Sequence, residues 1–161
     1  MGRQEIDVRK TIAAPPSTVY ALLRDGAGWP DWSPLGSFEL ERPGTTEREG
    51  LGAVRVFHTG RVHSREEIVE LVPDRRFSYR LLSGLAIRDY RADVDLESDA
   101  DGTRLRWHST FKPKVPGTGW LYRRQLGGFI RKLVDGLAEH AAQTAPASGQ
   151  TALTGMPASA R

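Results

Sequence analysis

The chain has 161 residues, of which 39% are hydrophobic and 27% charged, and its net charge is +3. This length suits one domain with a sizeable core. The lack of cysteine excludes disulfides, thiolate metal sites and a thiol nucleophile, and it fits a cytoplasmic protein. The charge is too mild to indicate a nucleic-acid partner. No apolar run approaches the roughly 20 residues of an integral membrane segment, and the N-terminus does not resemble a signal peptide.

The first part of the chain predicts short elements separated by turns. Residues 5–12 alternate apolar and charged side chains, which is typical of a half-buried strand. Pro15 and Pro16 then open a short helix. The sequence WPDWSP, from Trp29, predicts an aromatic turn or second short helix whose tryptophans cap one end of the core. Six further strands are expected at residues 38–41, 52–58, 61–72, 76–82, 87–97 and 103–112.

One long helix is predicted over residues 117–144. Its apolar side chains follow the i, i+3, i+4, i+7 spacing of a single helical face. Such a stripe needs a broad cover, and an antiparallel sheet with one polar face supplies it. We expect one domain at residues 1–144. Residues 145–161 are small and polar without periodicity, so we expect them to form a disordered tail.

Several segments, taken in order, resemble a known fold. They are IAAPPSTVYALLRD, GWPDWSP, GLGAVRVF, REEIVELVPDRRFSYRLLSG and DGTRLRWHSTFKPKVPG. Their order and spacing are similar to the START/Bet v 1-like (SRPBCC) superfamily, particularly its polyketide cyclase/dehydrase-like branch. The resemblance implies an α+β helix-grip fold, with a curved antiparallel sheet of about seven strands around a long C-terminal helix and two short helices after the first strand. It also implies a cavity between sheet and helix, although no catalytic motif carries across residue by residue.

The inward face of the strands carries aromatic and hydroxyl side chains opposite the apolar stripe of the helix. The expected ligand-binding residues are Tyr79, Tyr90, Trp107, Ser109, Phe111, His58, Leu126, Phe129, Ile130 and Leu133. Such a wall suits a flat apolar ligand, and the same residues would equally build a filled core. Gly127 and Gly128 each cost about 1 kcal/mol relative to alanine within a helix. They indicate either space for a ligand or close packing on the sheet.

The histidines and acidic residues offer weaker patterns. A turn at Gly60 would set His58 opposite His63 across a hairpin, but no third ligand has suitable spacing, so we expect no metal and no cofactor. His58 faces either the cavity, as an acid or base, or the solvent.

The carboxylates resemble catalytic pairs in composition alone, at Glu66-Glu67 and in the set Asp89, Asp93 and Asp95. The three aspartates share the solvent face of one strand. We expect them to meet arginines of neighbouring strands such as Arg104 and Arg106.

Two functions follow as hypotheses. The first is a binding module that holds a small hydrophobic, aromatic or polyketide-like molecule between sheet and helix. The second is a cyclase/dehydratase-type enzyme in which a Tyr, His or Arg of the pocket moves protons. A role in protein interaction would need an exposed apolar patch. Six basic residues and no acidic one between residues 112 and 134 would attract an anion or a membrane surface, or simply form a solvated helix face.

Overall fold

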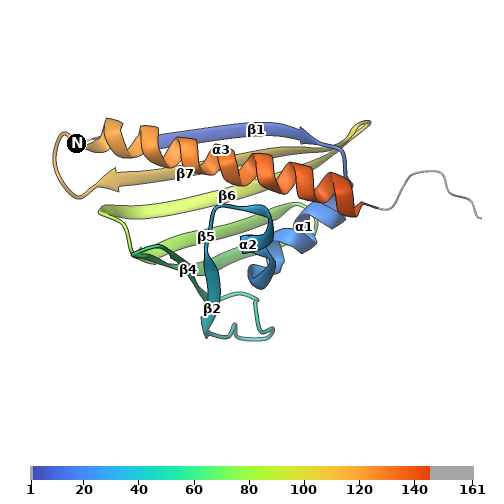
Figure 1. Ribbon diagram of the computed structural model, residues 1–161, viewed down its shortest axis with the longest axis horizontal. Helices are drawn as coiled ribbons and strands as arrows, with labels where there is room; N and C mark the ends of the chain where they lie inside the picture. Colours follow the sequence, from blue (N-terminus) through green and yellow to red (C-terminus); the bar gives the residue numbers. More distant parts are fainter. Residues whose placement is uncertain (1, 146–161) are drawn as a thin grey trace, which may run out of the picture.

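The computed structural model describes residues 2–145, which form a curved antiparallel sheet around a long helix (Figure 1). Within these residues the sheet has seven strands in the order β1-β7-β6-β5-β4-β3-β2, so the first strand pairs with the last. The strands are β1 Gln4–Ile12, β2 Ser37–Arg42, β3 Val54–Thr59, β4 Val62–Val72, β5 Arg76–Ser83, β6 Ile87–Asp99 and β7 Gly102–Pro113. The expected helix-grip fold is confirmed.

Three helices and one 3-10 turn complete the described part of the chain. They are α1 Pro16–Arg24, η1 Gly26–Gly28, α2 Trp29–Trp32 and α3 Gly119–Thr144. Pro16 is the first residue of α1. Proline lacks a backbone N–H, and this costs nothing here because the N–H groups of a first helical turn have no partner within the helix. The observed ends differ from the predicted ones by a residue or two, because periodicity fixes an element and not its ends. The expected disordered tail lies, from residue 146 on, outside the described residues.

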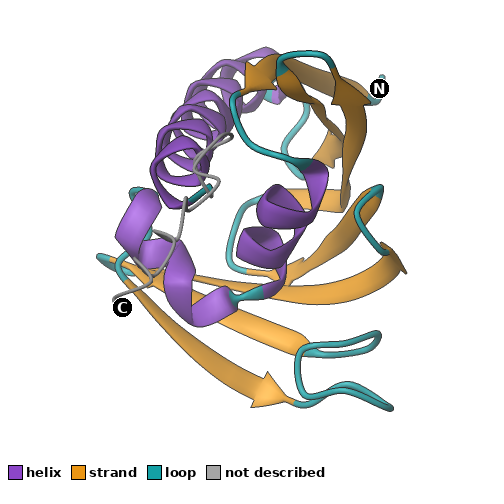
Figure 2. Ribbon diagram, turned by 90° about the vertical axis from the view of Figure 1, so that its right-hand side faces the viewer, coloured by secondary structure: helices purple, strands orange, loops and turns teal. Residues whose placement is uncertain are grey.

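All three helices lie on the concave side of the sheet. α3 runs along β1 and β7, while α1 and α2 lie beside its C-terminal half (Figures 1 and 2). Figure 2 shows the sheet curling around these helices. α1 and α2 therefore cover one end of the concave face, and at the other end only the N-terminal half of α3 covers it.

Trp29 lies at the centre of the hydrophobic core. Its ring centroid is 5.2 Å from that of Phe57, 5.9 Å from that of Trp107 and 5.0 Å from that of Trp32. These contacts reach from β3 to β7, and Trp29 is 1% exposed. The sequence prediction placed both tryptophans at one end of the core, and this is wrong for Trp29, because α2 directs its ring across the width of the sheet.

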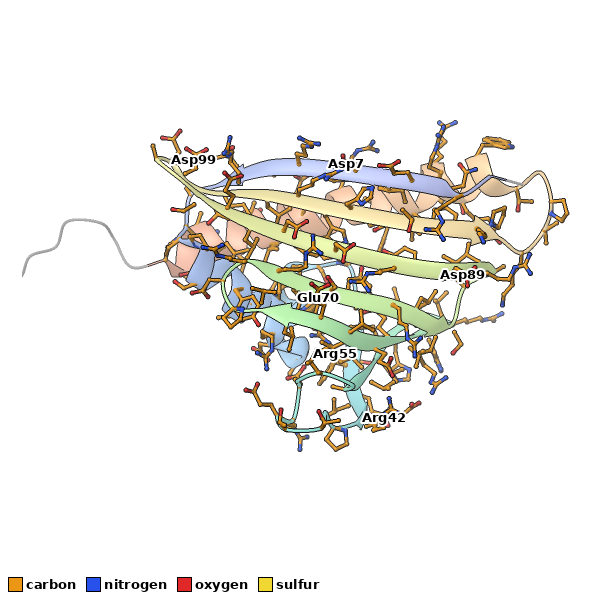
Figure 3. All side chains as sticks on the ribbon, turned by 180° about the vertical axis from the view of Figure 1, so that it is seen from behind. Asp7, Arg42, Arg55, Glu70, Asp89 and Asp99 are labelled. Carbon is orange, nitrogen blue, oxygen red and sulfur yellow. The ribbon has the colours of Figure 1, made fainter. Side chains whose placement is uncertain are left out.

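The convex face carries charged side chains that pair between strands (Figure 3). Arg106 binds Asp7 at 2.9 Å, and Arg76 binds Asp95 at 2.6 Å. The aspartates of β6 lie on this face as predicted, and Asp95 meets an arginine of a neighbouring strand, Arg76 of β5, although the two arginines given as examples have other partners. Arg106 reaches diagonally to β1, and Arg104 pairs with carboxylates at the end of β6. Long arginine side chains select among several nearby carboxylates, so strand alternation does not identify their partners.

Candidate functional site

A cavity of about 270 Å³ lies between the concave face of the sheet and the N-terminal half of α3. Its outer part is bounded by residues that keep some solvent exposure: Val62, Leu81, Leu85, Tyr122, Gln125, Leu126 and Phe129. Its inner part is bounded by buried residues: Trp29, Leu35, Tyr79, Tyr90, Ile130 and Leu133. The cavity therefore opens to solvent beside α3 and the turns of two hairpins, and it ends at Trp29.

The helical wall follows directly from sequence spacing. Leu126, Phe129, Ile130 and Leu133 recur at i, i+3, i+4 and i+7, so they share one face of α3 and point at the sheet. Gly127 and Gly128 are not part of the lining. The other alternative, close packing on the sheet, is not found either, since a Cβ at 127 would make ordinary contacts near 4 Å and one at 128 would meet nothing within 4 Å.

Three hydroxyl groups form a buried chain across the sheet wall. The oxygen of Tyr79 lies 3.2 Å from that of Tyr90, which lies 3.0 Å from Oγ of Ser109. Burial raises the pKa of Tyr90 to about 12 and that of Tyr79 well above its ordinary value. Both phenols are therefore neutral near pH 7. Three hydroxyl hydrogens share two hydrogen bonds, so one hydrogen remains for another acceptor.

Glu66 brings a carboxyl group to a lining that is otherwise uncharged among the described residues. It lies on β4, paired with Arg55 on β3 and Leu81 on β5. The side chain keeps intermediate exposure because it borders the cavity, and protein atoms surround it. This burial raises the pKa of Glu66 to about 7, against the opposing effect of the Arg55 charge. Near neutral pH the group can therefore give or accept a proton.

Arg55 supplies a fixed positive charge outside the cavity lining. It is 1% exposed, its Nη1 donates to the carbonyl oxygen of Leu23 at 3.0 Å, and its guanidinium lies 4.7 Å from the ring centroid of Trp29. Its Nε lies 3.9 Å from a carboxylate oxygen of Glu49. Burial lowers the pKa of Arg55, but arginine starts so high that it stays charged.

Six of the residues expected to bind a ligand border the cavity, from both of its walls: Tyr79, Tyr90, Leu126, Phe129, Ile130 and Leu133. Trp107, Ser109 and Phe111 are buried on the same face of the sheet but lie behind the lining. Trp107 packs edge-on against Tyr79, Phe111 packs against Tyr90, and Ser109 is bonded to the Tyr90 hydroxyl. These three residues support the wall rather than border the cavity.

His58 lies on the face of β3 that points away from the cavity. Its Nε2 is 3.3 Å from a carboxylate oxygen of Glu39. The predicted pairing of His58 with His63 across the hairpin is confirmed, with ring centroids 4.3 Å apart. Across residues 2–145 no three histidine or acidic side chains are grouped as metal ligands would be.

The sequence analysis considered Glu66 only as part of a pair of carboxylates, and it placed neither Glu66 nor Arg55 at the site. Glu66 stands in the charged run Arg65-Glu66-Glu67, which hides the alternation of β4. Ile68 is 1% exposed and two residues further on, so counting back from it would have placed Glu66 on the same inward face. Arg55 stands in the continuously buried run of β3, where alternation gives no signal.

The comparison with protein families agrees with this architecture. The model of a family described as polyketide cyclase/dehydrase and lipid transport matches residues 3–142. The chain belongs to this family. Membership and fold are consistent with binding of a hydrophobic ligand or with cyclase-like activity. No curated protein matches the chain closely enough to count as a relative.

Solved structures similar to this member of the polyketide cyclase/dehydrase and lipid transport family share its fold. A START superfamily protein from Mycobacterium smegmatis has a TM-score of 0.72 at 14% identity, over 88% of this chain and 97% of that one. Ara h 8.0201 has a TM-score of 0.70 at 16% identity, over 88% and 99%. Ginseng major latex-like protein 151 from Panax ginseng has a TM-score of 0.68 at 12% identity, over 86% and 97%. Such low identities establish the fold alone. In the described range, no helix has the length and apolar character needed to cross a membrane.

Proposed function

We propose that the protein binds a small hydrophobic molecule, aromatic or polyketide-like, in the cavity between the sheet and α3. The observation that carries this proposal is the cavity itself, about 270 Å³ in size and bordered on two sides by aromatic and aliphatic side chains. A concave, mostly apolar site with a few polar groups is the usual form of a small-molecule site. The buried rings of Trp29, Tyr79 and Tyr90 offer faces and edges to a flat ligand.

Filling the cavity from the protein side tests this proposal. Leu133 borders its inner part, so Leu133→Trp should place the indole in empty space and abolish binding of N-phenyl-1-naphthylamine, an uncharged fluorescent probe. The wild type should bind this probe in a 1:1 ratio. Leu137→Trp is the matched control, because Leu137 lies one turn later, is 0% exposed and is outside the lining.

The two variants should differ in stability as well as in binding. Leu137→Trp should overpack the core and lower the free energy of unfolding by about 1–3 kcal/mol, whereas Leu133→Trp should lower it much less. If Leu133→Trp were destabilised like Leu137→Trp and the wild type bound no probe, the space would be a packed core. If the wild type binds the probe, native mass spectrometry of freshly purified protein would identify any small molecule that it retains.

Glu66 supports a second candidate function, a polyketide cyclase/dehydratase-type reaction. Its pKa of about 7 and its place in the same cavity as the neutral Tyr79 and Tyr90 hydroxyls suit proton transfer to a bound poly-β-ketone. His58 and Arg55 lie outside the lining, so the candidate acid or base is a carboxyl group rather than a histidine or arginine. The test compares the cyclised products of a poly-β-ketone thioester, by mass spectrometry, with wild type, Glu66→Gln and no protein. Identical product distributions would exclude catalysis.

A further inference from the structure

Two adjacent glutamates of β4 have opposite surroundings. Glu67 points to the convex face, where its carboxylate is bound by Arg42 at 2.7 Å and by Arg80 at 2.8 Å. Glu66 points to the concave face and borders the cavity. Successive side chains of a strand point to opposite faces, so one position separates a carboxylate with two partners from one with none.

Glu66 has no hydrogen-bond or ion-pair partner among residues 2–145, and the Arg55 charge reaches it from a distance. Arg55 is its register partner, but the guanidinium is held by the Leu23 carbonyl oxygen and the Trp29 ring instead. A carboxyl group withdrawn from water without a partner is unfavourable. A bound molecule with a hydrogen-bond donor would supply the partner that the Glu66 carboxyl group lacks.

Two more polar side chains lie along the same wall. Oγ1 of Thr59 borders the cavity and is buried, and it has no hydrogen-bond partner within the described chain. Oγ of Ser64 makes one long hydrogen bond, 3.4 Å, to the carbonyl oxygen of Phe57. The register of β3 and β4 places Ser64 between Thr59 and Glu66. We call Thr59, Ser64 and Glu66 the polar row, and it lies in a cavity whose α3 wall is mostly apolar.

We propose that Glu66 accepts a hydrogen bond from a hydroxyl group of the bound molecule, so that the cavity selects hydroxylated aromatic compounds over hydrocarbons of the same shape. This inference rests on the proposed function and narrows its ligand class. The apolar face of the ligand lies on α3, and its oxygen-bearing edge lies along the polar row. A neutral hydroxyl suits the site better than an ammonium group, because the fixed charge of Arg55 lies on the adjacent strand and repels a cation.

A matched pair of ligands and a matched pair of variants test the inference. The ligands are 2-naphthol and 2-methylnaphthalene, which differ in one hydroxyl group. Each competes with N-phenyl-1-naphthylamine at about pH 8, where Glu66 is ionised. The measured quantity is the ratio of the Kd of 2-methylnaphthalene to the Kd of 2-naphthol. The variants are Glu66→Leu, Glu66→Gln and, as control, Glu67→Gln on the opposite face.

The ratio should fall roughly tenfold or more from wild type to Glu66→Leu, the effect of losing one hydrogen bond to a charged group. Glu66→Gln should give an intermediate ratio, because its amide oxygen still accepts, and Glu67→Gln should keep the wild-type ratio. Glu66→Leu should still bind 2-methylnaphthalene, which shows that its cavity is intact.

Three results would overturn the inference. An unchanged ratio in Glu66→Leu, with both ligands bound, would remove Glu66 as the acceptor and leave the proposed function standing. Tighter binding of 2-naphthylmethylamine than of 2-naphthol, lost in Glu66→Leu, would assign the site to a cation. Failure of the wild type to bind the fluorescent probe or either ligand would overturn the proposed function together with the inference.

Discussion

Gly136 of α3 lies directly against the main-chain carbonyl oxygen of Trp32. A Cβ atom at position 136 would overlap this oxygen and approach the Trp32 carbonyl carbon to 3.0 Å. The backbones of α2 and α3 are therefore in direct contact, which glycine permits because it has no Cβ atom. Since α2 also carries Trp29, this contact positions the ring that closes the inner part of the cavity.

We predict that Gly136→Ala lowers the free energy of unfolding by about 1–3 kcal/mol, because the overlapping atom belongs to the backbone and cannot rotate away. Gly128→Ala is the matched control in the same helix. Its new Cβ meets nothing within 4 Å, so the gain in helix propensity should raise stability by up to about 1 kcal/mol. Urea unfolding of both variants measures the two effects, and changes of the same sign would contradict the assigned contact.

The fold could be predicted because its main elements have uninterrupted periodicity. β6 and β7 alternate cleanly through Tyr90, Ala92 and Val94 and through Leu105, Trp107 and Ser109. α3 keeps one apolar stripe over its length. Gly136 was not singled out, because nothing local distinguishes a glycine that contacts another helix from one that faces open space.

The composition of the cavity was predicted less completely. The α3 wall followed from helical spacing and the two tyrosines from strand alternation, whereas the place of the Glu66 carboxyl group in the lining did not. A register shift of the β4–β5 ladder lies beside it, and charged residues flank it. The extent of the cavity depends on how Trp29 and α3 pack, which is a tertiary property that no local pattern contains.

Glu66 should make stability depend on pH. Its pKa rises from an ordinary 4.5 to about 7 on folding because of burial. Below about pH 4.5 it is protonated in both states, and above about pH 7 the folded state carries an unfavourable buried charge. The free energy of unfolding should therefore fall, by about 1–3 kcal/mol, as the pH rises through this window. Arg55 on β3, Tyr79 on β5 and Tyr90 on β6 lie around Glu66 and keep their charge states in this pH range.

The control for this prediction is again the adjacent carboxylate. Glu66→Gln should remove this contribution, while Glu67→Gln should keep it, so the difference between their stability profiles isolates Glu66 from the histidines. The carboxyl group of Asp7 affects stability in a different, more acidic pH range. Its hydrogen bond to Arg106 lowers its pKa from 3.8 to about 2, so its contribution is present above about pH 4 and is lost toward pH 2. Identical profiles for the two glutamine variants between pH 4.5 and pH 7 would refute the assignment.

Arg55→Met should raise the pKa of Glu66 further. The Arg55 charge opposes the effect of burial on that carboxyl group, so its removal leaves burial unopposed. Stability should change little, because methionine fills a similar volume, two buried nitrogens that make no hydrogen bond disappear, and the Leu23 carbonyl oxygen still accepts from Trp29. An NMR titration of the Glu66 carboxyl carbon measures the shift. Arg80→Met, which removes a partner of Glu67, should leave that titration unchanged.

Tyr90→Phe should destabilise the protein more than Ser109→Ala. The Tyr90 hydroxyl bridges two buried groups, and removing it leaves the Tyr79 hydroxyl and Ser109 Oγ without this partner at the same time. Buried polar groups left without a hydrogen bond lower the free energy of unfolding by about 1–3 kcal/mol. Ser109→Ala removes only the hydroxyl at one end of the chain and should lower it by about 1 kcal/mol. Urea unfolding with unchanged m-values measures both losses. Equal losses would mean that Tyr90 does not link the other two hydroxyls, and that the chain does not act as one network in the cavity wall.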